Sequence, residues 1–383
     1  MNWYYIHHYF DPDFDHLHLK PVADSKGQVN LRNLNYVQNV VRGQVLAEIR
    51  DLAPSTSPLP EKRFIMQEPV LPVGANTEID PENPRRLLAS KNGFVFYHNK
   101  EITIKHLLNV RRNIDLHTGN IAFVGDLAVH GDVTSEFELR AANVLVKGII
   151  ESAFIRTTGS IVGEGGFKGS QEGKLIADRD VRLAFAETGE IRAGHNIAID
   201  GTCLHCNIFT GSNLLVRGRL AGGVTRARHK VYVSHQLGLP STTPTRVVLG
   251  QNPFVYRLIK KLEREQERLQ NKMDKLNLLR ERELQKTGEE KPPDKHYLLV
   301  QKKLEVLSRK LTDLRPKLYE EEMYKECILV VPGEILPGVI ITIGDISLRV
   351  QKPEQDVHVR RVGDEIVIRQ PAVLQKYSLK DYM

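Results

Sequence analysis

The chain has few cysteines and lacks a long uninterrupted apolar run. Only 3 cysteines occur among 383 residues, which argues against a disulfide framework and is typical of a reducing compartment. Prolines, glycines and a glutamate interrupt the most apolar stretch, residues 328–343, so it is not a candidate membrane span. The first eight residues lack a basic region followed by an apolar run, so we expect no signal peptide. These features favour a cytoplasmic protein.

Acidic residues are missing from one long part of the chain. No Asp or Glu occurs from Gly201 to Leu262, although the whole chain has 47 acidic and 54 basic side chains. A basic surface of this kind suits an acidic protein, an anionic membrane or nucleic acid, and a solubilising surface is the simpler alternative. Few aromatic side chains are interleaved with it, which disfavours nucleic acid. The candidate partner-binding surface consists of Arg217, Arg219, Arg226, Arg228 and Lys230.

Apolar anchors recur through the middle of the chain at a nearly fixed interval of about 17 residues. All but one have an apolar partner two residues later, which predicts a short strand with one face inward. A repeat of this length predicts a solenoid, because a single repeat cannot bury its own apolar face. The anchors are Leu127, Val144, Ile161, Val181, Ile197, Leu214 and Val231.

Each repeat divides further into three short sides. Inward positions follow one another at steps of about six residues, as in Leu127, Val133 and Leu139. Glycines such as Gly131, Gly148 and Gly159 fall near the expected corners, where a bend needs a positive φ or no side chain. The one interval of 20 residues contains 168–173, which predicts a loop at a corner. The sequence therefore predicts a mainly β, three-sided parallel β-helix.

The whole chain divides into four predicted domains. Residues 1–115 are predicted to form an N-terminal α/β or β capping domain, with a hairpin of strands 93–97 and 101–104. Residues 116–250 form the β-helix, 251–326 an antiparallel helical coiled-coil hairpin, and 327–383 strands that return to close the β-helix.

Heptad spacing supports the helical hairpin. Leu262, Leu269, Met273, Leu276 and Leu279 predict an apolar seam on the first helix. Each arm should be about 30 residues long, and Pro316 should bend or loosen the second arm. The seam of the second arm is Tyr297, Val300, Leu304, Leu307, Leu311, Leu314 and Leu318.

Three constellations raise the question of chemistry, and each has a structural interpretation that we favour. Cys203 and Cys206 form a single Cys-x-x-Cys pair, whereas structural zinc needs four ligands, so core packing is preferred. The histidines 130, 195, 205, 229 and 235 are candidates for an acyl-transfer base by residue type only. The carboxylates 178, 180, 187 and 190 are candidates for polysaccharide cleavage, and are better explained as a solvated face.

Four segments resemble the flagellar assembly protein A (FapA) family: Asn113–Val133, Gly43–Ile49, Ser241–Thr245 and Leu336–Gly344. The resemblance implies a right-handed parallel β-helix and a bacterial cytoplasmic protein linked to flagellar assembly. It implies no catalytic residues, and from the residues themselves we expect no cofactor and no metal. The proline-rich segment 52–65 departs from the glycine-rich stretch usual in the family.

These observations favour a non-enzymatic scaffold that binds a protein partner and self-associates. Two alternatives remain open. One is a β-helix enzyme acting on polysaccharide or in acyl transfer, and the other is a binder of anionic surfaces through the basic residues.

Overall fold

The computed structural model describes residues 3–16, 18–19, 21, 30–53, 58–240, 243–287, 292–318 and 324–372. Parts of three predicted features lie outside the described residues: Ser241 and Thr242 of one family-like segment, 54–57 of the proline-rich segment, and 373–383 of the C-terminal region. The chain forms two compact units, Met1–Ala193 with Ile199–Thr202, and Gly194–Ala198 with Cys203–Met383. Among the described residues, no helix is long and apolar enough to cross a membrane.

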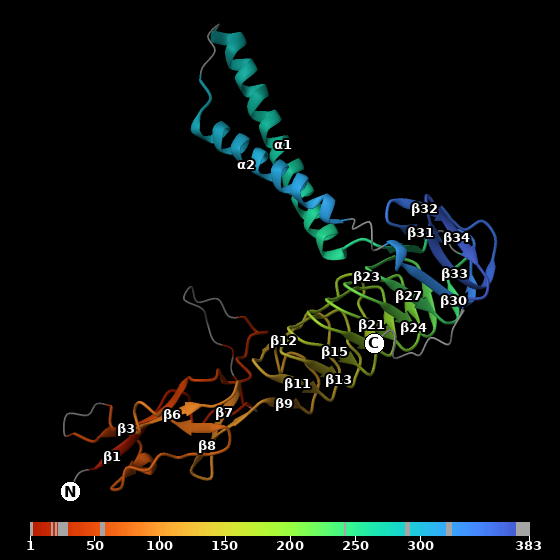
Figure 1. Cartoon of the computed structure of the whole chain (residues 1–383). Coiled ribbons are helices and arrows are strands. Elements are labelled where there is room, and N and C mark those ends of the chain that lie inside the picture. The colour runs from red at the N-terminus through yellow and green to blue at the C-terminus, as the bar shows by residue number, and fades with distance from the viewer. Residues whose placement is uncertain are drawn as a thin grey trace. The chain divides into compact units, whose positions relative to one another are not determined.

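The first unit begins with two antiparallel sheets (Figure 1). The predicted hairpin is confirmed, and its turn residues Asn99 and Lys100 have left-handed φ values of 49° and 65°. Among the described residues before 106, the only helix is the 3-10 turn Lys62–Phe64, so this N-terminal region is β rather than α/β. The five-stranded sheet has the order β4 (Ile65–Met66), β1 (Tyr4–His8), β3 (Val45–Asp51), β6 (Arg86–Ala89), β5 (Thr77–Ile79), and the three-stranded sheet β2 (Asn39–Val40), β7 (Gly93–His98), β8 (Glu101–Lys105).

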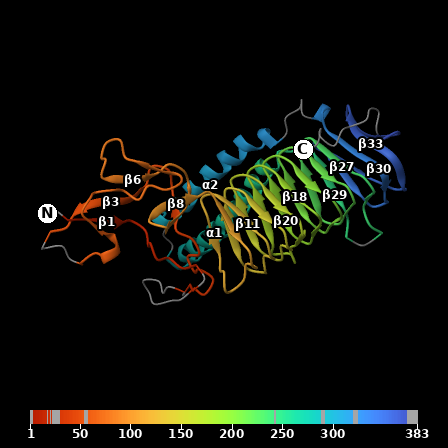
Figure 2. The ribbon, with the colours of Figure 1, turned by 90° about the horizontal axis from the view of Figure 1, so that it is seen from below.

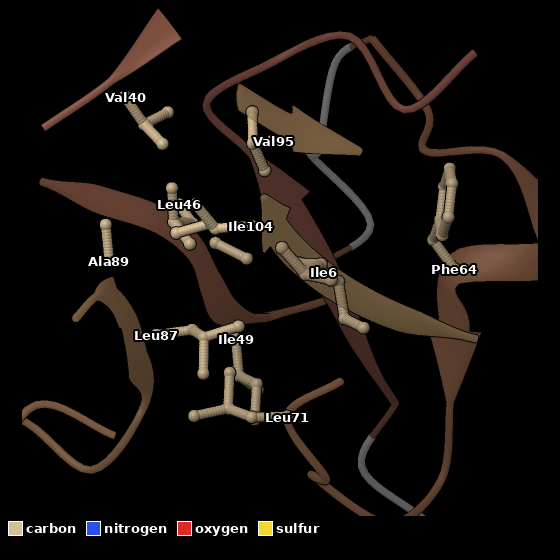
Figure 3. Packing of buried hydrophobic residues seen from close by; sticks show 12 residues of the cluster. Ile6, Val40, Leu46, Ile49, Phe64, Leu71, Leu87, Ala89, Val95 and Ile104 are labelled. Atoms are coloured by element: carbon tan, nitrogen blue, oxygen red, sulfur yellow. The ribbon is translucent and has the colours of Figure 1, made fainter. Parts of the chain in front are cut away.

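Both sheets contribute to one apolar core, seen from close by in Figure 3. Leu46 and Ile49 of β3 and Leu87 of β6 come from the first sheet, and Ile104 of β8 comes from the second. None of these four side chains is more than 4% exposed. Burying each contributes about 1.5–3 kcal/mol relative to exposure, so the two sheets stabilise each other.

A parallel stack with three walls follows in the first unit. The predicted anchors Leu127, Val144, Ile161 and Val181 occupy one register, each paired with the next. The stack already includes β9, upstream of residue 116, where the sequence placed its start. The first wall is β9 (Leu107–Val110), β11 (Asp126–Val129), β13 (Val144–Val146), β15 (Ile161–Gly163) and β18 (Val181–Leu183).

The second and third walls complete each turn. The second wall begins as single bridges that join Ile114, Val133, Ile150 and Phe167, and continues as β16 (Phe167–Lys168) and β19 (Ala186–Glu187). The loop predicted at 168–173 is confirmed by the left-handed turn residues Ser170 and Gln171. The third wall is β10 (Ile121–Ala122), β12 (Glu138–Ala141), β14 (Phe154–Thr157), β17 (Lys174–Ala177) and β20 (Glu190–Ala193).

The second unit repeats the three-walled arrangement, so the predicted β-solenoid is confirmed. Leu214, Val231 and Leu329 lie in one register, and Ile197 N–H donates to the Asn213 carbonyl at 3.0 Å. Its strands are, wall by wall, β21 (Ile197–Ile199), β24 (Leu214–Val216), β27 (Lys230–Val233); β22 (Cys203–Leu204), β25 (Arg219–Ala221), β28 (Gln236–Leu237); and β23 (Asn207–Thr210), β26 (Val224–Ala227), β29 (Arg246–Leu249).

Two helices are inserted between β29 and the strand that resumes the stack (Figure 1). Strand β30 (Ile328–Ile335) pairs in parallel with β27 and β28, and β31 (Ile340–Ile343) pairs in parallel with β29. The predicted return of the C-terminal strands is therefore confirmed. The strands β32 (Ile346–Arg349), β33 (Glu354–Val362) and β34 (Glu365–Arg369) add antiparallel partners; Figure 2 shows β30 and β33 together.

The helical hairpin consists of α1 (Pro253–Thr287) and α2 (Lys295–Leu314). The predicted seam of the second arm is confirmed, because Val300, Leu307 and Leu311 are buried among exposed neighbours. The predicted length of the second arm was wrong, since α2 has 20 residues and ends at Leu314. Proline lacks an N–H and disfavours helix in the preceding residue, so Pro316 ends the helix instead of bending it.

Candidate interaction surfaces

The five basic residues predicted as one surface are distributed around the stack of the second unit. Arg219 lies on β25, Arg226 on β26 and Lys230 on β27, and these strands belong to three different walls. Arg217 follows β24 and Arg228 follows β26. Arg219 is exposed, and the other four are partly buried. The structure therefore does not gather the five onto one face.

Arg226 is engaged by the base of the helical hairpin. Its guanidinium carbon lies 4.1 Å from the ring centroid of Tyr256, and its Nη2 donates to the Tyr256 hydroxyl at 3.2 Å. Phe209 of β23 adds a second ring at 5.8 Å, and Arg257 lies 5.3 Å from that ring. Burial lowers the pKa of Arg226. Cation–π contacts of this kind contribute about 1–2 kcal/mol when desolvated. Arg226 thus anchors the first turns of α1 within its own chain.

The outer surface of the hairpin carries leucines that its own seam does not use. Two contacts show which residues of α1 and α2 lie opposite each other. The Arg280 guanidinium lies 4.8 Å from the Tyr297 ring, and Gln266 Nε2 donates to Ser308 Oγ at 3.0 Å. Within two residues of the Arg280–Tyr297 contact, four leucines are about half exposed. They are Leu278 (47%), Leu279 (55%), Leu298 (49%) and Leu299 (52%).

Leu279 was predicted in the seam, and that prediction was wrong. The seam of α1 steps through Leu269, Met273 and Leu276, of which Met273 is buried and the other two are partly buried, and the next seam position is Arg280. Because Arg280 stacks on Tyr297, Leu279 is turned out of the interface. Apolar side chains that a helical pair leaves exposed are available for contact with a protein partner.

The cysteine pair lies inside the stack. Cys203 is fully buried and Cys206 is 2% exposed. A hydrogen bond from the neighbouring thiol, together with burial, raises the pKa of Cys203 well above its usual range. The Cys203 thiol therefore stays protonated, and both cysteines fill the core, which supports the packing interpretation. Within the described part of the chain, no group of three or more His, Cys, Asp and Glu side chains is arranged to hold a metal ion.

Two of the four carboxylates considered for polysaccharide cleavage lie on different walls of the stack. Glu187 lies on β19 of the second wall and Glu190 on β20 of the third. The Glu190 carboxylate forms an ion pair with Arg192 of the same strand. Acid–base cleavage needs two carboxyl groups facing one bond, whereas Glu187 and Glu190 lie on different walls of the stack.

Models of known protein families match two regions of the chain. A model of the Flagellar Assembly Protein A N-terminal region matches residues 6–100, and a model of the Flagellar Assembly Protein A beta solenoid domain matches residues 106–366. No curated protein and no solved structure matches the chain. The solenoid model alone covers well over half of the sequence. The chain therefore belongs to the flagellar assembly protein A family.

Proposed function

We propose that this protein is a non-enzymatic cytoplasmic scaffold in flagellar assembly, and that it binds a protein partner through the outer leucines of its helical hairpin. The observation that carries the proposal is that Leu278, Leu279, Leu298 and Leu299 are each about half exposed near the Arg280–Tyr297 contact. The seam already holds α1 and α2 together, so these side chains are not needed to fold the hairpin. Apolar side chains left exposed at one level of a helix pair have a cost in solubility, which partner binding would offset.

The charge of the hairpin indicates the chemistry of the partner. Helix α1 has 10 Lys and Arg against 6 Asp and Glu, and α2 has 5 against 2. A partner with an apolar patch surrounded by acidic residues would complement this surface and would associate faster at low salt. The positive charge of the hairpin therefore favours an acidic protein partner, as the basic residues 217–230 did in the sequence.

The test is flagellar assembly in a strain of the native host that lacks the chromosomal gene. The double substitution Leu279→Gln with Leu299→Gln removes apolar surface while keeping good helix formers. We expect this variant to restore far fewer flagella than the original chain. The matched control substitutes Leu59→Gln and Leu116→Gln, which are 79% and 63% exposed outside the hairpin. Full restoration by the hairpin variant would contradict the proposal.

A second surface supports the self-association that the sequence suggested. On the first wall of the first unit, Ala128, Leu145 and Val162 are paired in register and alternate with the inward anchors. They therefore form an outward apolar row, and such rows pack against a second sheet about 10 Å away.

We expect Leu145→Lys with Val162→Lys to lower the molar mass measured by light scattering. The outward Ile176→Lys on the third wall is the control, and an unchanged mass would remove this surface from the proposal.

The two alternatives make different predictions. An anionic-surface binder would attach to vesicles containing phosphatidylglycerol, and the exposed Arg219→Glu substitution would weaken that attachment. A β-helix enzyme would turn over a polysaccharide or an acyl-CoA, with loss of activity on substitution of a histidine or a carboxylate. Either result, with the hairpin leucine variant unaffected, would replace the scaffold proposal.

A further inference from the structure

The first unit contains a cavity that none of the surfaces above uses. It has a volume of about 360 Å³ and lies between the segment that starts at Asp11, the strands β7 and β8, and β9 of the stack. This volume is at the lower end of the range for small-molecule sites. A reciprocal clamp holds one side in place, because Asp11 N–H donates to Gln38 Oε1 at 2.7 Å and Gln38 Nε2 donates to the Asp11 carbonyl at 2.8 Å.

Flat aromatic side chains line much of the cavity. They are Phe14, Tyr36, Phe94, Phe96 and Tyr97. The Phe94 and Phe96 rings are 5.6 Å apart at an interplanar angle of 31°. Tyr36 is 8% exposed, and burial raises its pKa, so its hydroxyl keeps its proton at neutral pH. Rings arranged in this way favour a planar ligand through stacking.

Two cations lie at the same cavity. Lys105 Nζ is 5.1 Å from the Phe96 centroid, and Arg111 follows β9 at the surface. Within the described residues, neither has a carboxylate at ion-pair distance. Among the described residues that line the cavity, the only carboxylate is that of Asp11, whose Oδ1 accepts the N–H of Asp13 at 3.0 Å in its own turn. The cavity thus combines a ring-binding wall with uncompensated positive charge.

We propose that this cavity binds a small aromatic anion, with its ring against the Phe94 and Phe96 wall and its phosphate or carboxylate group between Lys105 and Arg111. Lysine and arginine both recognise phosphate and carboxylate through charge-assisted hydrogen bonds. The volume suits one ring system with one anionic group, such as a nucleoside monophosphate or an aromatic carboxylate. The site is independent of the hairpin leucines, so its failure would leave the scaffold proposal unaffected.

The test is calorimetric titration of the full chain with AMP, GMP, UMP and salicylate. Adenosine, which lacks the anion, and inorganic phosphate, which lacks the ring, separate the two parts of the recognition. We expect at least one ring-bearing anion to bind more tightly than both of these. The nucleotides and the carboxylate distinguish the two sources of the same chemistry.

Variants locate the binding in the cavity. We expect Lys105→Met and Arg111→Met each to weaken binding roughly tenfold, because each removes one charge-assisted contact. Both side chains are exposed, so the fold should persist, and thermal melts check this. The control Lys147→Met removes an exposed cation elsewhere in the first unit. Lack of binding by all four ring-bearing anions at millimolar concentration, or equal weakening by Lys147→Met, would overturn the proposal.

Discussion

At the scale of single residues, three corners of the stack pair a glycine with a side-chain amide or carboxylate of the preceding turn. Asn143 Oδ1 accepts the N–H of Ser160 at 2.8 Å, and a Cβ on Gly159 would collide with that same oxygen. Gly131 with Asn113, and Gly148 with Asp132, repeat the arrangement. None of the three glycines has a positive φ. Glycine is required here because the side-chain oxygen occupies the space of a Cβ.

The sequence predicted the glycines at the corners but left two reasons for them open. In the structure, these glycines are needed because they lack a side chain and not because of a positive φ. The Asn and Asp residues that lie against them were not predicted. The signal was present, because Asn or Asp lies about one turn before each of these three glycines. A search for apolar periodicity alone does not detect it, since a side-chain cap for a backbone N–H has no apolar component.

Gly159→Ala should destabilise the stack by about 1–3 kcal/mol, the usual cost of forcing an extra carbon into a packed site. The midpoint of urea unfolding measures this effect. If the collision with Asn143 is the cause, the double variant with Asn143→Ala should cost less than the sum of the single variants. Strict additivity would contradict the pairing.

His8 should make the first unit sensitive to acid. Burial lowers the pKa of His8 to about 4, with His7 and Arg63 adding to the effect and Asp13 opposing it. Its Nε2 is buried without a hydrogen-bond partner in the described residues. Since the folded pKa lies below the unfolded value of 6.5, stability is fully present above pH 6.5 and falls as the pH drops toward 4.

The measurement is the melting temperature at pH 7.5 and pH 5. We expect the original chain to lose at least about 2 °C more than His8→Phe, which keeps a ring beside Phe64 and Tyr97. The exposed His18→Phe should behave like the original chain. An equal loss in all three would show that His8 is not the acid-sensitive group.

At the scale of elements, the helical hairpin was predicted well in type and poorly in its ends. Heptad spacing located both helices because an apolar seam is a local property of the sequence. The length of α2 was overestimated, because apolar residues at heptad positions continue to Leu318 past Pro316. The anchoring of α1 through Arg226 was not predictable, since it joins β26 to a helix across 30 residues of sequence.

Arg226→Leu should loosen the start of α1 while leaving β26 folded. The substitution removes the contact with the Tyr256 ring and the hydrogen bond to its hydroxyl. We expect amide hydrogen exchange to rise roughly tenfold in the first two turns of α1, with little change in the stack. Arg219→Leu, on the exposed surface of β25, is the control. Unchanged exchange in α1 would show that other contacts hold the hairpin.

At the scale of the whole molecule, the apolar period of about 17 residues predicted the solenoid, because burial between turns requires that period wherever the chain coils. Function was predicted less fully. The basic residues were grouped by their closeness in sequence, whereas successive sides of a three-walled turn face different directions. The hairpin leucines were not singled out, since exposure depends on which helix position meets Tyr297.

The scaffold proposal depends on whether the hairpin meets another protein in the cell. A photo-crosslinking amino acid at position 279, compared with one at position 116, measures this directly in growing cells of the native host. We expect a discrete adduct with a flagellar assembly protein at position 279 and none at position 116. Absence of an adduct at 279, or the same adducts at both positions, would contradict it.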